Sequence, residues 1–487
     1  MVASAQGLDP SDWQGFRAQA HRMLDDILDF SQDIRQRPVW QPTPPGVAQA
    51  RAASLPEAPS ELADVHQQFL TEILPYTCLN AHPAFMGWVQ GGGTAVGMVA
   101  DMLAAGLNAN VGGRQQAPVE LERQVCHWMR DLFGFPTTAS GLFVTGTSMA
   151  NLMAVLVARH QAAGPTVRQQ GVPQTSGKLV AYTSSAAHGC VAQAMDLCGL
   201  GTDALRRMPV NARHQMDLAA LEAQIEQDKA AGLTPFLVIG TAGSVDVGAV
   251  DELHAIARLA QAHGMWFHVD GAYGALGMLS PAIAPLLRGI EEADSIAFDF
   301  HKWGQVPYDA GFLLVRDGQA HQATFAAPAA YLRRECQGPS AGTLWPCDLG
   351  PDLSRGFRAL KTWFTFKVYG SDRLGQVIAG TCELAQALAQ RVRDEPRLEL
   401  LAPVTLNIVC FRYRCAHPDQ INAQLVLALQ SSGVCLPSST MVEGRFAIRA
   451  AIVNHRTTMA DIDTLLQATL AEGDRLTMSR AAQGEQA

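Results

Sequence analysis

The chain has 487 residues, and apolar residues make up 48% of it, which is enough for a large core and excludes a disordered protein. The formal net charge of −9 excludes the basic surface of a general nucleic-acid binder, so we expect no nucleic-acid partner. No apolar run is long enough to cross a bilayer, and the N-terminal residues lack a basic start and an apolar stretch, so we expect neither a membrane partner nor a secretory signal. Ten cysteines without metal-site spacing indicate reduced thiols in a cytoplasmic protein, with no metal site.

The first predicted elements form a helical arm. Residues 11–34 have the apolar spacing of an amphipathic helix, and the prolines that follow end it. Residues 47–80 are again helical in pattern. Such an arm must pack on the main body or on a partner chain, so we assign residues 1–80 to an N-terminal arm that serves in dimerisation.

In the middle of the chain, short apolar runs alternate with helical patterns such as Asn151–His160 and Val250–Ala262. This order predicts an α/β domain over residues 81–350, with a mostly parallel sheet and helices on both faces. Ligands of such sheets bind at the carboxyl ends of the strands. The predicted strands are Gly141–Thr145, Leu179–Thr183, Phe236–Gly240, Trp266–Val269, Ser295–Phe298 and Gly311–Val315.

Residues 351–487 have the pattern of a smaller α+β domain. A long helix begins within residues 354–370 and continues to residue 393. Thr405–Tyr413 and Arg445–Ile452 are predicted strands, and Ala460–Ala471 is a closing helix.

Lys302 is the first candidate catalytic residue. It lies just beyond a predicted buried strand, in SIAFDFHKWGQVPY (295–308). The aromatic flanks Phe298, Phe300 and Trp303 would partly desolvate its ammonium group and make the neutral, nucleophilic amine accessible. Schiff-base chemistry requires such an amine.

Asp270 is the second candidate, at the end of the predicted strand in WFHVDGAYG. Taken alone it could be a helix cap, a metal ligand or a partner for a buried cation. The segment between Asp270 and Lys302 has room for one helix and one return strand. Both residues should therefore come to the same edge of the sheet.

Two further motifs follow predicted strands. In FVTGTSMAN, Thr147 and Ser148 open a helix, where free backbone N–H groups can bind a phosphate, although an ordinary N-cap explains the same residues. His188, in SSAAHGCV, could stack on a flat cofactor, although a lone histidine also fits a structural role.

Together these motifs select pyridoxal 5′-phosphate. This cofactor needs a lysine for its aldehyde, a carboxylate for its ring nitrogen, an anion site for its phosphate and a flat group on its ring face. Lys302, Asp270, the 147–148 helix start and His188 supply one each.

The same motifs resemble the pyridoxal-phosphate-dependent group II amino-acid decarboxylases, which include aromatic-L-amino-acid, glutamate, histidine and tyrosine decarboxylases. The similarity extends from about residue 15 to 470. The shared motifs are HPAFMGW (82–88), PVELERQV (118–125), FVTGTSMAN, AAHGCV, HVDGAYG, ADSIAFDFHKW and IRAAIVNHRTT (448–458). The resemblance implies fold type I, the aspartate-aminotransferase type, with a mostly parallel seven-stranded sheet. It also implies a homodimer with a shared active site.

By that resemblance, Lys302 binds the cofactor covalently, Asp270 pairs with the ring nitrogen, and His188 and Ala272 lie on its two faces. Phosphate-binding residues would be Thr147, Ser148 and His301, with Asp299 beside them, and Thr241 would lie near the ring. Substrate-binding candidates are His82, Phe85, Trp88 and Arg449. From the residues alone, Arg114 is a further candidate for an acidic substrate group, although a solvated arginine is the simpler explanation.

Two departures from the family bear on the product and the substrate. Decarboxylases carry a loop tyrosine that protonates the substrate carbon, whereas this chain has Trp345-Pro346 near that place and Tyr331 lies earlier. Glycines 91–93 stand where aromatic decarboxylases have bulkier residues, and would leave space or allow close approach to a ligand.

These observations predict an amino-acid decarboxylase that yields an amine and CO2. Alternatives are a decarboxylation-dependent oxidative deaminase that forms an aldehyde, an aminotransferase or other lyase on the same scaffold, and a degenerate binding protein without turnover.

Overall fold

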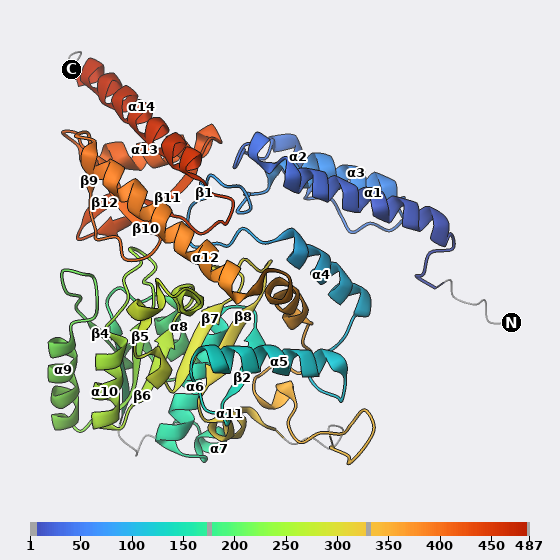
Figure 1. The fold of residues 1–487 in the computed structure, drawn as a ribbon, viewed down its shortest axis with the longest axis vertical. Coiled ribbons are helices and arrows are strands. Elements are labelled where there is room, and N and C mark those ends of the chain that lie inside the picture. Colours follow the sequence, from blue (N-terminus) through green and yellow to red (C-terminus); the bar gives the residue numbers. More distant parts are fainter. Residues whose placement is uncertain (1–6, 173–177, 328–332, 485–487) are drawn as a thin grey trace.

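The computed structural model describes residues 7–172, 178–327 and 333–484. Its centre is a seven-stranded sheet in the order β2-β8-β7-β6-β5-β3-β4 (Figure 1). β8 is antiparallel to both of its neighbours and the other pairs are parallel, which confirms the predicted mostly parallel sheet. The strands are β2 (Ser140–Val144), β3 (Leu179–Ser184), β4 (Leu205–Met208), β5 (Thr234–Thr241), β6 (Trp266–Asp270), β7 (Ser295–Asp299) and β8 (Gly311–Val315).

Helices cover both faces of this sheet because its side chains alternate between two apolar layers. Phe298 points into a layer with helices on one face, and its neighbour Ala297 points to the other. The first face carries α5 (Ala117–Leu132), α9 (Leu218–Ala230) and α10 (Leu253–His263). The second carries α6 (Thr147–Ala163), α8 (Cys190–Leu197) and α11 (Gly318–Phe325), with the short α7 (Val167–Gln170) next to α6.

Two expectations for this domain were incomplete. β4 was not predicted because its sequence, LRRM, lacks a continuous apolar run. Its first and last residues are buried, and two arginines lie between them. The link from Asp270 to β7 contains 3-10 helices at 274–279, 284–287 and 290–292 where one helix was predicted. Glycines and prolines in this stretch disfavour a regular α-helix.

The small domain has a five-stranded sheet in the order β1-β11-β12-β10-β9. Its first strand, β1 (Phe85–Met86), comes from just after the N-terminal arm and pairs with β11, so residues 85–86 contribute to the sheet of the small domain. The predicted long helix is present as α12, with a kink at Gly370 where φ is 73°. The remaining bounds are β9 (Leu398–Leu400), β10 (Ile408–Tyr413), β11 (Leu436–Val442), β12 (Arg445–Ala451), α12 (Arg358–Asp394), α13 (Pro418–Ser432) and α14 (Met459–Gly484).

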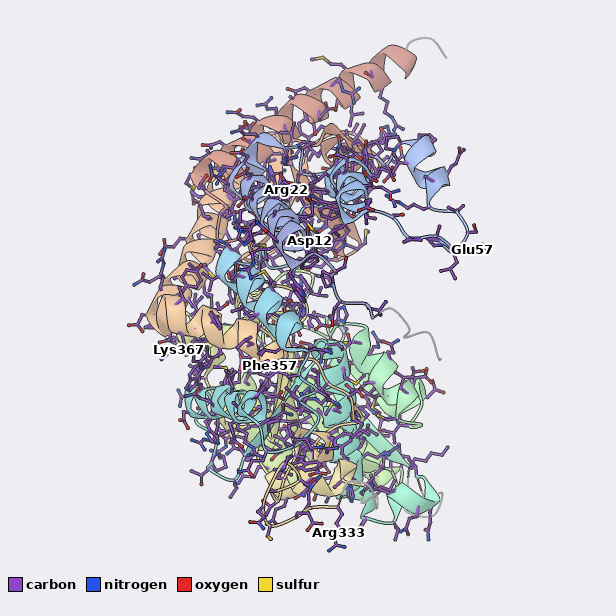
Figure 2. The ribbon with its side chains drawn as sticks, turned by 90° about the vertical axis from the view of Figure 1, so that its right-hand side faces the viewer. Asp12, Arg22, Glu57, Arg333, Phe357 and Lys367 are labelled. Carbon is purple, nitrogen blue, oxygen red and sulfur yellow. The ribbon has the colours of Figure 1, made fainter. Side chains whose placement is uncertain are left out.

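The N-terminal arm lies beside the small domain, to its right in Figure 1. Its helices are α1 (Trp13–Gln32), α2 (Pro45–Ala50) and α3 (Leu62–Gln68), and α4 (Ala95–Leu107) follows beside α1. The helical pattern expected over 47–80 is present in part, as α2, α3 and short helical turns at 69–76, and the stretch with Pro56 and Pro59 between them is not helical. Figure 2 shows Glu57 in this interruption, far out from the rest of the chain. Within the described ranges, no helix combines the length and apolar character needed to span a membrane.

Candidate active site

The carboxyl ends of neighbouring parallel strands bring the predicted residues together. Thr241 ends β5 and pairs with Asp270, the last residue of β6. Asp270 pairs in turn with Ala297 of β7, and Lys302 follows three residues after β7 ends. β2 leads into α6 at the same edge. The convergence predicted from the sequence is therefore present.

These strand ends surround a cavity of about 550 Å³. Every residue that was predicted to bind the cofactor lines it, and so does Trp88 at its rim. Gln90, Cys190, Val245 and Tyr308 also line it and were not predicted. Nothing in their local sequence distinguishes them, since only the folded chain brings them to the wall.

Lys302 forms an ion pair inside this cavity. Its Nζ lies 2.9 Å from Asp299 Oδ2, and the Asp299 side chain is only 3% exposed. The other Asp299 oxygen accepts a hydrogen bond of 2.7 Å from the backbone N–H of Thr147. Asp299 thus ties the lysine to the start of α6, a closer role than the peripheral one that the sequence indicated.

Besides the Tyr273 hydroxyl, two buried threonine hydroxyl groups in the wall have no hydrogen-bond partner among the described residues. They are Thr147 Oγ1, at the start of α6, and Thr241 Oγ1, at the end of β5. A buried hydroxyl without a partner is unfavourable, so both positions fit an oxygen-rich ligand. The N-terminus of α6 adds the positive end of a helix dipole, which favours a phosphate.

His301 is oriented toward the same end of the cavity. Its Nδ1 accepts a hydrogen bond of 3.0 Å from the Ala310 N–H, so the neutral ring carries its proton on Nε2. Burial lowers the pKa of His301, and Asp299 opposes that shift from 3.5 Å. The ring of Tyr308 lies 4.2 Å from the imidazole, centroid to centroid. His301 can therefore donate a hydrogen bond to an anion without carrying a charge of its own.

Asp270 faces the cavity from a buried position. Its Oδ1 accepts the Ala272 N–H at 3.1 Å and its Oδ2 accepts Asn151 Nδ2 at 3.0 Å. Burial raises the pKa of Asp270, and the nearby Lys302 ammonium opposes the shift most strongly. A carboxylate held in this way can accept the N–H of a protonated ring nitrogen. The residues present thus fit pyridoxal phosphate at each of its reactive groups.

The other predicted substrate residues do not line the cavity in this chain. His82 is buried, and its Nδ1 accepts the Ala84 N–H. Phe85 belongs to β1, Arg114 stacks on Trp345, and Arg449 is engaged elsewhere. Their assignment to substrate binding stays a prediction.

Arg449 holds a loop of the cavity wall in place. Its Nε donates to the Val245 carbonyl at 2.9 Å and its Nη1 donates to Ser438 Oγ at 3.0 Å. Val245 lies in the cavity wall. The small domain therefore positions this loop of the large domain through a buried arginine.

The glycines after Trp88 serve chain packing. A Cβ on Gly91 would lie 2.4 Å from the carbonyl oxygens of His301 and Lys302, and one on Gly92 would lie 2.6 Å from the Asn454 side chain. Glycine is needed at both positions because the backbone of this segment lies against the lysine loop and the small domain.

Comparisons with known proteins point to the same cofactor. Residues 44–414 match the model of the pyridoxal-dependent decarboxylase conserved domain. The chain is 31% identical over 474 residues to an aromatic-L-amino-acid decarboxylase of Bacillus atrophaeus, covering 95% of this chain and 96% of that one. It is 28% identical over 465 residues to a phenylacetaldehyde synthase of Arabidopsis thaliana, covering 92% and 94%. The solved structure of Oryza sativa TDC with PLP and tryptamine superposes with a TM-score of 0.89 at 26% identity, covering 97% of this chain and 100% of that one.

Proposed function

The chain belongs to the pyridoxal-dependent decarboxylase family, and we propose that it releases CO2 from an L-amino acid with an aromatic side chain. It is a pyridoxal-phosphate-dependent carboxy-lyase of fold type I. The observation that carries the assignment of the site is the single cavity that joins Lys302, Asp270 and the two unpartnered threonine hydroxyls.

Four residues of the cavity would have a part in this chemistry. When bound, pyridoxal phosphate withdraws the electron pair that remains on Cα after CO2 departs. Lys302 would hold its aldehyde group, and Asp270 would accept a hydrogen bond from its ring nitrogen. Thr147 Oγ1 and the positive end of the α6 dipole would hold its phosphate, with His301 Nε2 as a further donor.

The substrate class rests on the cavity wall and on the relatives. Trp88 and Tyr308 are half-exposed aromatic side chains in the wall, with Val89 beside them. Aromatic rings favour aromatic ligands through offset or edge-to-face contacts. The relative from Bacillus atrophaeus is an aromatic-L-amino-acid decarboxylase.

Aldehyde formation is the second candidate. Between Asp309 and Asp352 the only tyrosine is Tyr331, which lies outside the described residues. Trp345, at the place expected for the loop tyrosine, is 1% exposed and does not line the cavity. In this reaction the amino acid, O2 and water would yield an aldehyde, CO2, ammonia and hydrogen peroxide. The similarity to a phenylacetaldehyde synthase supports keeping this alternative.

Product analysis by mass spectrometry tests the function. Purified protein with added pyridoxal phosphate is incubated in air with a panel of L-amino acids. We expect amine and CO2 from aromatic substrates, and no product from Lys302→Ala. Aldehyde with hydrogen peroxide would establish the second candidate, and turnover restricted to acidic substrates would overturn the substrate class. A 2-oxo acid would overturn decarboxylation in favour of transamination. Stoichiometric cofactor binding with no turnover across the panel would support a degenerate binding protein.

We further propose that the protein is a cytoplasmic homodimer with a shared active site. Exposed apolar side chains gather on the arm and on α4, where Trp13 and Leu107 are each more than half exposed. α1, α3 and α4 line an apolar groove there. All ten cysteines are free thiols, which supports a reducing compartment.

A further inference from the structure

A series of buried hydrogen bonds connects Trp266 to Asp270. Trp266 Nε1 donates to Ser295 Oγ at 2.8 Å, and Ser295 Oγ lies 2.8 Å from His268 Nδ1. His268 Nε2 lies 2.8 Å from Asn151 Oδ1, and Asn151 Nδ2 donates to Asp270 Oδ2 at 3.0 Å. Ser295, His268 and Asn151 are each at most 1% exposed, and none of them lines the cavity.

In this series of hydrogen bonds, each group donates to the next group in the direction of Asp270. An indole N–H can only donate, so Ser295 Oγ accepts it and is free to donate its own proton to His268 Nδ1. The histidine then carries its proton on Nε2, which donates to Asn151 Oδ1. The amide nitrogen of Asn151 is left to donate to Asp270. Burial lowers the pKa of His268 to about 3, so its ring is neutral and has the one N–H that this order requires.

If the hydrogen bonds between His268, Asn151 and Asp270 had the opposite direction, Asp270 would have to be protonated. His268 Nδ1 would donate to the Ser295 carbonyl, at 3.1 Å, and the Asn151 amide would turn its oxygen to Asp270. Two acceptor oxygens would then face each other unless Asp270 were protonated. The Lys302 ammonium, the Ala272 N–H and His188 all favour the carboxylate against the effect of burial. Cys190, which accepts from Asn151 at 3.3 Å, is a neutral thiol because burial raises its pKa to about 11.

We propose that Asn151 and His268 are positioning residues for the cofactor. They hold Asp270 as an oriented carboxylate, so that the ring nitrogen of bound pyridoxal phosphate keeps its proton. The inference rests on the proposed pairing of Asp270 with that nitrogen. Asn151 and His268 contribute by orienting Asp270, without touching the cofactor themselves.

A pair of ligands tests this role separately from folding. One is pyridoxal phosphate and the other is its 1-deaza analogue, in which a C–H group replaces the ring nitrogen. Dissociation constants are measured by absorbance titration of the full-length protein. Asn151→Leu and His268→Phe should weaken binding of pyridoxal phosphate about tenfold or more, the range for losing a hydrogen bond to a charged group. Binding of the analogue should change much less, because it offers no N–H to Asp270.

Two control variants test whether the lost hydrogen bonds are the cause of the weaker cofactor binding. His268→Gln should restore pyridoxal phosphate affinity, since its amide N–H can replace Nε2–H. Asn422→Leu removes an equally buried amide in α13, which binds the Tyr413 backbone far from the cavity. It should leave both affinities unchanged.

The outcomes separate this inference from the proposed function. The positioning role is overturned if Asn151→Leu and His268→Phe weaken the binding of both ligands equally, or weaken the binding of neither. If Asp270→Asn fails to discriminate the two ligands, the pairing of Asp270 with the ring nitrogen is itself wrong. Discrimination by Asp270→Asn alone would overturn only the role of Asn151 and His268.

Discussion

At the scale of single residues, the site depends on buried charges that each have a partner. The aromatic side chains beside Lys302 were expected to desolvate it, but Phe298, Phe300 and Trp303 are fully buried in the core. The side chain of Lys302 reaches the cavity, where Asp299 pairs with it. A buried ammonium group without such a partner would be strongly unfavourable.

Asp251 is a buried carboxyl group that titrates near neutrality. It accepts hydrogen bonds from the backbone N–H groups of Met216, at 2.7 Å, and Thr241, at 2.8 Å, and thereby fixes the end of β5. Burial raises its pKa from 3.8 to about 6. The folded protein therefore binds this proton more tightly than the unfolded chain, and the stabilisation is lost as the pH rises from about 4 through about 6.

Asp251→Asn removes this titration. The free energy of unfolding of the parent protein should fall relative to that of the variant by up to about 3 kcal/mol over this pH window. Urea unfolding of both proteins at a series of pH values measures the difference. A difference that does not change with pH would show that Asp251 does not titrate in this window.

At the scale of elements, Trp345 packs the segment before α12 against the large domain. Guanidinium groups of Arg334 and Arg114 lie 3.5 and 4.8 Å from the Trp345 ring centroid. A Cβ on Gly113 would lie 2.4 Å from the same ring, so the indole packs directly on this glycine. Cation–π contacts and burial together hold this segment.

Trp345→Ala should release the segment. Loss of a buried tryptophan costs about 3–5 kcal/mol, and here the effect is expected to be local opening. Limited proteolysis with trypsin should cleave the variant after Arg333 or Arg334 faster than the parent protein. Trp345→Phe keeps a ring on Gly113 and should be cleaved at an intermediate rate. Equal cleavage of all three proteins would contradict the anchoring role.

At the scale of the whole molecule, the apolar face of the arm and α4 is left exposed by the described residues. Met102 is 50% exposed in the groove beside α1, and Leu103 and Leu107 lie nearby on α4. Apolar patches of this kind are typical of interfaces. A second copy of the chain is the partner that we propose.

Met102→Glu should therefore shift the protein toward the monomer, because it places a charge in the apolar interface. Sedimentation or light scattering over a concentration series measures the mass. Leu427→Glu alters a leucine on α13 that is 63% exposed and outside this face, and it should leave the mass unchanged. A parent protein that is monomeric at all concentrations would rule out the dimer.

The sequence by itself determined the alternation of strands and helices and the identity of the cofactor. Asp270 ends a strand and Lys302 and Thr147 follow strands, and the carboxyl ends of parallel strands meet at one edge of the sheet. Local patterns were also sufficient to predict the long helix α12, because its apolar spacing persists along its length. Over 47–80 they were correct only in part, because two prolines leave a non-helical stretch between α2 and α3.

Only the tertiary structure decided which side chains meet. Asp299 and Lys302 are close in sequence, but Asn151, His268 and Ser295 come from three separate elements. Arg449 reaches Val245 from another domain, and Trp345 packs on Gly113 far along the chain. Contacts between distant residues depend on how whole layers pack, and packing leaves no periodic pattern in the sequence.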